Sequence, residues 1–184
     1  KFERALAEGT VADTLNRFES KDGDFFFLEA RTVHALGENT LVYEIQQTSN
    51  ITFRVFDWGR MGLDGKPRPL HVAESLETID FSRSGFGPKR PAFAADARGG
   101  ETRVLAECPY FSMEERRGET LKGAATGRCV IVVGIAGKGR LATAGGELSV
   151  GAMETALVPA AAGAWTLTAD GDAGVTALVA TPRF

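Results

Sequence analysis

Between residues 23 and 60, apolar side chains recur at every second position within three short runs. This period places one set of side chains on one face of a strand. A turn-forming cluster, Gly37, Glu38 and Asn39, separates the first two runs and is of the kind that joins antiparallel strands. The pattern predicts three consecutive strands of one sheet, with alternating apolar positions at Phe25, Phe27, Leu41, Tyr43, Ile45, Phe53 and Val55.

The first eighteen residues have helical rather than alternating spacing. Gly9 interrupts the helical pattern, and Thr10 followed three residues later by Asp13 resembles a capping box. The segment therefore predicts two short helices before the sheet, with apolar positions at Phe2, Leu6, Val11, Leu15 and Phe18.

Residues 82–100 replace this alternation with glycine, proline and charge, a composition typical of a linker. Short strand-like runs then return, separated by glycines and small polar residues, as expected of hairpins in a sandwich or jelly roll. The predicted strands are 103–107, 111–116, 129–134, 139–142, 147–150, 155–158, 164–169 and 175–181. The fold class predicted for the whole chain is all-β with short N-terminal helices.

Composition argues against several classes of function, namely nucleic-acid binding, membrane binding and membrane spanning. The 184 residues are 43% apolar and carry a net charge of -3, which describes a soluble globular chain of one large or two small domains. Without a run of Lys or Arg, nothing in the sequence indicates binding to nucleic acid or to an anionic membrane. No apolar run approaches the roughly 18 to 20 residues that span a bilayer. Cys108 and Cys129 are read as reduced thiols of a cytoplasmic protein.

Three side chains with distinct chemistry lie in the predicted three-stranded sheet. His34 follows the first strand, Glu44 lies in the second and Arg54 in the third, so an imidazole, a carboxylate and a guanidinium could converge on one face. Simpler interpretations remain open. His34 could be a hydrogen-bonded structural histidine, because one imidazole alone makes no metal site. Glu44 and Arg54 could form a cross-strand ion pair. His71, beside two prolines, is expected to anchor a loop.

The spacing around His34 resembles the second conserved motif of the cupins. That motif runs glycine, five residues, proline, one residue, glycine, two residues, histidine. Gly23 and His34 match it, whereas Glu29 stands at the proline position and Arg31 at the second glycine position.

A longer stretch resembles the type I mannose-6-phosphate isomerases of bacteria. The matching residues follow in the same order and spacing over about residues 20–81: 32–35, 43–49, 52–54, 57–60, 70–71 and 79–80. The resemblance implies tandem cupin or jelly-roll barrels. Residues 1–81 would then belong to the catalytic barrel, with a helical lead-in at 1–18. Residues 82–100 would be the linker, and 101–184 a degenerate second barrel in which Ala164 takes the place of His34.

The resemblance also implies an activity, the interconversion of mannose 6-phosphate and fructose 6-phosphate. Arg54 matches the active-site arginine of the family and would stabilise the developing oxyanion. Glu44 matches a pocket glutamate and could transfer the proton. The expected partner is a small phosphosugar, and the chain could form a homo-oligomer.

In that family a zinc ion is held by a Gln-x-His motif, a glutamate and a later histidine that His34 resembles. The Gln-x-His motif is not found in this sequence, and the family's missing ligands precede the helical lead-in. We therefore expect the chain to be the C-terminal part of a longer protein and to be inactive alone. The alternative, which Glu29 and Arg31 favour, is a non-catalytic cupin that binds a sugar or supports assembly after losing its metal.

Overall fold

The computed structural model describes residues 1–83 and 85–183, which form two compact units. The first unit is Lys1–Lys89 and the second is Arg90–Phe184. Their boundary lies inside the segment interpreted as a linker from composition. The two units are described separately below.

The first unit contains helices at both of its ends. The lead-in forms α1 (Phe2–Glu8) and a 3-10 helix, η1 (Val11–Thr14), so two short helices are confirmed. Gly9 ends α1 in the left-handed conformation, with φ of 72°. The predicted capping box is wrong, because the Thr10 side chain makes no cap hydrogen bond. A further helix, α2 (Val72–Thr78), was not predicted.

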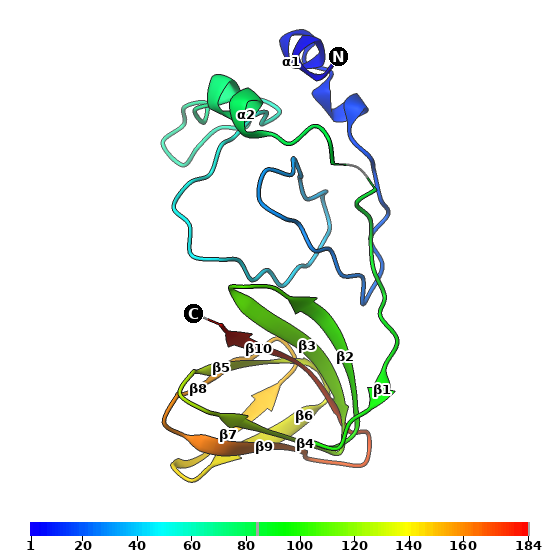
Figure 1. The fold of residues 1–184 in the computed structure, drawn as a ribbon, viewed down its shortest axis with the longest axis vertical. Coiled ribbons are helices and arrows are strands. Elements are labelled where there is room, and N and C mark those ends of the chain that lie inside the picture. The colour runs from blue at the N-terminus through cyan, green and yellow to red at the C-terminus, as the bar shows by residue number, and fades with distance from the viewer. Residues whose placement is uncertain (84, 184) are drawn as a thin grey trace. The chain divides into compact units, whose positions relative to one another are not determined.

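The three strands predicted in residues 23–60 are wrong. Among the described residues of the first unit there is no strand, and Figure 1 shows this stretch as extended loops in blue to cyan. Leu41 and Ile51 are 76% and 72% exposed. Alternation specifies which side chains share a face, but a strand also needs a neighbour for its backbone N–H and C=O groups. The predicted turn does form, with Asn39 at a φ of 56°.

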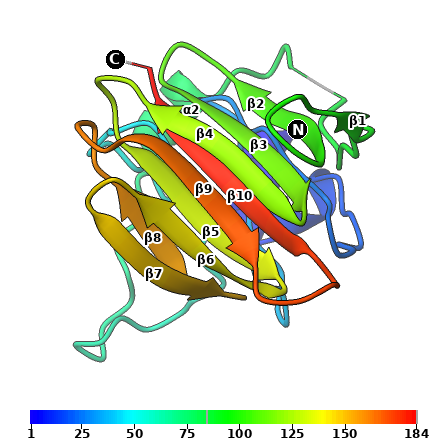
Figure 2. The ribbon, with the colours of Figure 1, turned by 90° about the horizontal axis from the view of Figure 1, so that it is seen from below.

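The second unit holds all ten strands of the described residues, and the all-β fold class is confirmed there. One sheet has the order β1-β2-β3-β10-β5-β8, and the other has the order β4-β9-β6-β7. Figure 2 shows β4, β9, β6 and β7 side by side in the second sheet. The strands are β1 (Ala94–Ala95), β2 (Glu101–Glu107), β3 (Phe111–Gly118), β4 (Thr120–Ala125), β5 (Val130–Ala136), β6 (Lys138–Thr143), β7 (Gly146–Gly151), β8 (Thr155–Val158), β9 (Gly163–Ala169) and β10 (Val175–Pro182).

The core of the second unit lies between its two sheets. Strand β9 alternates as the period of 2 requires, with Trp165 and Leu167 buried. Strand β10 pairs with β3 on one side and β5 on the other, and its central position matches its nearly continuous buried run. Side chains from both sheets meet in one cluster: Leu121, Ala125, Val130, Val132, Leu141, Val150, Ala156, Val158, Trp165, Leu167, Val175, Ala177 and Val179.

One arginine is enclosed within this unit. Arg116 on β3 has no exposed surface, and burial lowers the pKa of its guanidinium. The Nη1 group donates to the carbonyl of Lys122 at 2.8 Å, and the guanidinium carbon lies 5.7 Å from the ring centre of Trp165. A carboxylate oxygen of Asp96 lies 3.9 Å from Nε. The contacts of this buried guanidinium therefore connect β3 to Asp96, which precedes β2, and to Lys122 in β4.

Candidate functional site

Arg54 is held by one short loop of the first unit. Its backbone N–H donates to Nδ1 of His71 at 3.1 Å, and its carbonyl accepts the His71 N–H at 2.8 Å. At the far end of the side chain, Nη1 donates to the carbonyl of Pro69 at 3.1 Å. The main chain and the guanidinium are therefore both fixed by residues 69–71. The sequence predicted that His71 anchors a loop, and the structure places that loop against Arg54.

Asp57 organises the turn that follows Arg54. It is 4% exposed and accepts hydrogen bonds from two guanidinium groups. Arg68 Nε donates to Oδ2 at 2.6 Å, and Arg60 donates to Oδ1 from Nε at 3.0 Å and from Nη2 at 2.7 Å. These bonds, first that of Arg68, hold the pKa of the Asp57 carboxyl well below its usual value. Asp57 is thus a structural anion rather than a proton carrier.

The loop after this turn is closed by backbone hydrogen bonds. Gly62 N–H donates to the carbonyl of Lys66 at 2.7 Å, and Met61 bridges to Pro67. Together with the Asp57 bonds, this closure connects residues 54–60 to residues 66–71. Nothing in the sequence indicated that Arg68 binds Asp57, since its only signal was its place between two prolines.

His34 is exposed, and its ring is oriented by a local hydrogen bond. Nδ1 lies 3.0 Å from the carbonyl oxygen of Thr32. Since a carbonyl oxygen only accepts, Nδ1 carries the proton and Nε2 keeps its lone pair. This tautomer suits a metal ligand. However, the described residues contain no group of three His, Cys, Asp or Glu side chains that could hold a metal ion. The described residues therefore do not fit a complete zinc site.

The turn before His34 keeps a backbone shape that glycine favours. Arg31, which stands at a glycine position of the cupin motif, has a φ of 76°. Its Nε donates to the carbonyl of Thr78 at 2.7 Å, and its own carbonyl accepts the Asp80 N–H at 3.2 Å. Glu29, at the proline position, forms an ion pair with Arg83. Arg31 and Glu29, the two residues that differ from the motif, thus contact the end of α2 and the loop that follows it.

Glu44 is exposed and forms no hydrogen bond or ion pair with any described residue. The cross-strand ion pair with Arg54 considered from the sequence is not formed, because the Arg54 guanidinium binds Pro69. Within the described part of the chain, no hydrogen bond joins His34, Glu44 and Arg54 to one another.

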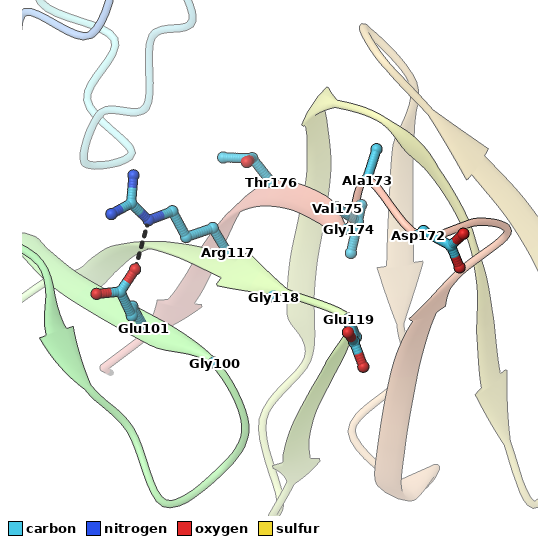
Figure 3. Close-up of a pocket in the computed structure, with 10 residues that line it drawn as sticks. All are labelled: Gly100, Glu101, Arg117, Gly118, Glu119, Asp172, Ala173, Gly174, Val175 and Thr176. Carbon is cyan, nitrogen blue, oxygen red and sulfur yellow. Dashed lines mark hydrogen bonds and ion pairs between the residues drawn. The ribbon is translucent and has the colours of Figure 1, made fainter.

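A shallow hollow in the second unit does not suit a phosphosugar. It is lined by Gly100, Glu101, Arg117, Gly118, Glu119, Asp172, Ala173, Gly174, Val175 and Thr176 (Figure 3). Its one cation, Arg117, donates to Glu101 at 2.8 Å and lies over the ring of Phe93. Three carboxylates in the lining would repel a phosphate. Ala164, at the position that the cupin pattern compares with His34, offers no ligand.

Known proteins with similar sequences are named as mannose-6-phosphate isomerases. The chain is 30% identical over 146 residues to the mannose-6-phosphate isomerase of Streptococcus mutans, covering 77% of this chain and 44% of that protein. It is 34% identical over 108 residues to a mannose-6-phosphate isomerase of Bacillus subtilis, covering 59% of this chain and 34% of that protein. The resemblance to mannose-6-phosphate isomerases is confirmed. No family model matches the chain.

A solved structure supports the fold. The crystal structure of the mannose 6-phosphate isomerase from Bacillus subtilis superposes with a TM-score of 0.56 at 21% identity, over 72% of this chain and 40% of that chain. The chain therefore shares its fold with that isomerase over the superposed part. The chain spans less than half the length of these mannose-6-phosphate isomerases.

Proposed function

We propose that the protein interconverts mannose 6-phosphate and fructose 6-phosphate. The observation that supports this proposal is the 30% sequence identity to a mannose-6-phosphate isomerase over 77% of the chain. The substrate would be a small phosphosugar. The two free cysteines favour a cytoplasmic enzyme. Nothing in the second unit is assigned to the reaction, and its barrel would support the first unit or the assembly of subunits.

The reaction moves one proton between neighbouring carbons. A base takes the proton from C2 of the open-chain aldose, and the electron pair forms a C1–C2 double bond as negative charge develops on the carbonyl oxygen. Returning the proton to C1, with a proton exchanged between the two oxygens, gives the ketose. Such chemistry needs an acid/base group and a cation at the developing oxyanion.

Arg54 and Glu44 are proposed for these two roles. Arg54 stays charged at any physiological pH and presents several N–H donors in a fixed fork, which suits an oxyanion. Its hydrogen bonds to His71 and Pro69 restrict the guanidinium, and preorganised donors lose little energy to reorganisation in the transition state. Glu44 has no competing partner among the described residues, so its carboxylate is available to accept a proton.

Zinc is proposed as the cofactor, with His34 as one ligand through Nε2. Bound zinc would act as a Lewis acid that polarises substrate oxygens. A catalytic zinc takes about three protein ligands, so the others would have to come from residues outside this sequence.

A non-catalytic cupin that binds a sugar or supports assembly is the second candidate. Arg31 and Glu29 favour it, because they replace motif residues in the turn that presents His34. The two candidates differ in whether the protein turns over a phosphosugar at all.

The test is an isomerase assay on the protein as its gene encodes it, with Arg54→Lys and Glu44→Gln variants. Lysine keeps the positive charge but loses the planar set of N–H donors that a guanidinium presents. Because removing one oxyanion donor typically lowers kcat by about 10² to 10³, a fall of that size is expected in Arg54→Lys. Arg140→Lys, at an exposed arginine of the second unit, is the matched control and should keep full activity. Wild-type rates in both the Arg54 and Glu44 variants would contradict the assignment.

A further inference from the structure

His71 contacts Arg54 with both its main chain and its ring. Its backbone N–H donates to the Arg54 carbonyl at 2.8 Å, and its ring Nδ1 lies 3.1 Å from the Arg54 N–H. One residue thus satisfies both backbone polar groups of Arg54. Without a strand on either side of Arg54, these bonds replace the ladder that would otherwise fix its direction.

The position of the ring proton follows from this contact. A backbone N–H can only donate, so Nδ1 must accept and carries no proton. The ring is then neutral, with its proton on Nε2. His34 has the opposite arrangement, since its Nδ1 faces the carbonyl of Thr32. The two histidines of this sequence are therefore expected to be different tautomers.

His71 is itself fixed by the elements around it. Its carbonyl accepts the N–H of Ser75 at 2.9 Å in the first turn of α2, and Ser75 is buried. The ring centre lies 6.0 Å from that of Phe53, tilted by 45°. Pro69, two residues earlier, restricts the backbone, and its carbonyl oxygen accepts a hydrogen bond from the Arg54 guanidinium. Movement of this loop would displace both ends of Arg54.

We propose that His71 is a positioning residue for the isomerase reaction. Its ring nitrogen Nδ1 holds Arg54 in place by accepting a hydrogen bond from the Arg54 backbone N–H. The inference rests on the proposed function for its catalytic consequence, but not for the hydrogen bond itself. His71 contacts no reacting atom in this account. Its contribution is to fix the conformation of the Arg54 main chain and thereby the orientation of the guanidinium. A displaced catalytic group loses rate because transition-state stabilisation depends on geometry.

The test compares His71→Asn with His71→Leu in the protein as its gene encodes it. Asparagine can place Oδ1 where Nδ1 lies and accept the Arg54 N–H, whereas leucine has nearly the same shape and no acceptor. We expect kcat to fall on the order of tenfold in the leucine variant with little change in KM, and the asparagine variant to recover most of the rate. Equal rates in all three proteins, or equal losses in both variants, would overturn the proposal.

A spectroscopic measurement keeps the test independent of activity and of variant folding. In a long-range proton–nitrogen NMR spectrum of the wild type, the His71 ring should show an unprotonated Nδ1 and a protonated Nε2, with His34 reversed as an internal comparison. A protonated Nδ1 on His71 would overturn the proposal even if the enzyme is active. An inactive wild type with the expected His71 tautomer would instead refute the proposed function, and with it the catalytic role, while leaving the hydrogen bond established.

Discussion

Asp57 accepts charge-assisted hydrogen bonds from two arginines of the first unit. Arg60 and Arg68 both donate to it, from three residues and eleven residues further along the chain. A buried carboxylate is stable only when such donors replace its water. The same donors lower its pKa, so its ionised form is part of the folded state.

This cluster predicts a pH dependence of stability. Because folding lowers the pKa of Asp57, its contribution is complete above the unfolded pKa of about 4 and is lost as the pH falls toward the folded value. In Asp57→Asn the unfolding free energy should be lower at pH 7 and should change less between pH 5 and pH 3. Urea unfolding followed by circular dichroism at each pH measures both effects. A variant with an unchanged acid dependence would show that Asp57 does not contribute.

Arg31 holds a backbone conformation that costs energy for any side chain. Its φ of 76° lies in the left-handed region, where Cβ approaches the following carbonyl. The hydrogen bond from its Nε to the carbonyl of Thr78 compensates in part. The arginine therefore ties the turn before His34 to the end of α2, a link that glycine could not make.

Replacing Arg31 by glycine and by alanine separates these two effects. Both variants lose the bond to Thr78, but only alanine keeps the cost of the left-handed backbone. We expect Arg31→Gly to unfold at a free energy about 1 kcal/mol higher than Arg31→Ala. Denaturant titration of the two variants measures the difference. An alanine variant as stable as the glycine variant would mean that the turn relaxes to another conformation.

Strands β4 and β9 pack more closely at one point than any side chain would allow. Gly123 pairs with Trp165, and a Cβ on Gly123 would lie 2.3 Å from Cζ2 of the indole. The ring covers the glycine and is 3% exposed, with the Arg116 guanidinium also near it. The small residue in β4 thus makes room for the largest side chain of the core.

Gly123→Ala should therefore destabilise the second unit. The indole must shift in a packed core, and such overpacking costs about 1 to 3 kcal/mol. Gly171→Ala is the matched control, because a Cβ there would contact nothing within 4 Å. Thermal unfolding followed by circular dichroism should show a lower Tm only for the first variant. Equal Tm values would indicate that Trp165 has free space to move.

The strands of the second unit were predictable because their apolar runs find partner strands in two sheets, although among the described residues only β1–β2, β2–β3 and β6–β7 pair consecutive strands. All eight runs predicted from residue 103 onward are confirmed as β2, β3 and β5 to β10. Strand β4 was missed because it contains Lys122, Gly123 and two alanines, which carry little strand signal. Its pairing with β9 is a tertiary effect that no local pattern records.

The same reasoning failed in residues 23–60, which alternate more clearly than β4. Their apolar positions are those of strands, but apart from one isolated bridge between Phe25 and Lys89 no described segment pairs with them. The candidate site was predictable only in its residue types. His34, Glu44 and Arg54 were identified by resemblance, whereas the role of His71 depends on a ring orientation that spacing cannot give.

At the scale of the whole molecule, chemistry and stability are divided between the two units. The buried apolar cluster lies entirely in the second unit, and the residues proposed for catalysis lie in the first. No helix among the described residues is long and apolar enough to pass through a bilayer. The sugar-phosphate site is thus proposed in the first unit alone, and no ligand is proposed at Ala164 of the second.

The most direct test of the account is metal content measured together with isomerase activity, in the protein as its gene encodes it and in His34→Ala. The account predicts about one zinc per chain in the wild type, conversion of mannose 6-phosphate to fructose 6-phosphate, and loss of both in the variant. A wild type without metal or activity would contradict it and favour the sugar-binding module. Zinc and turnover retained in His34→Ala would remove His34 from the metal site.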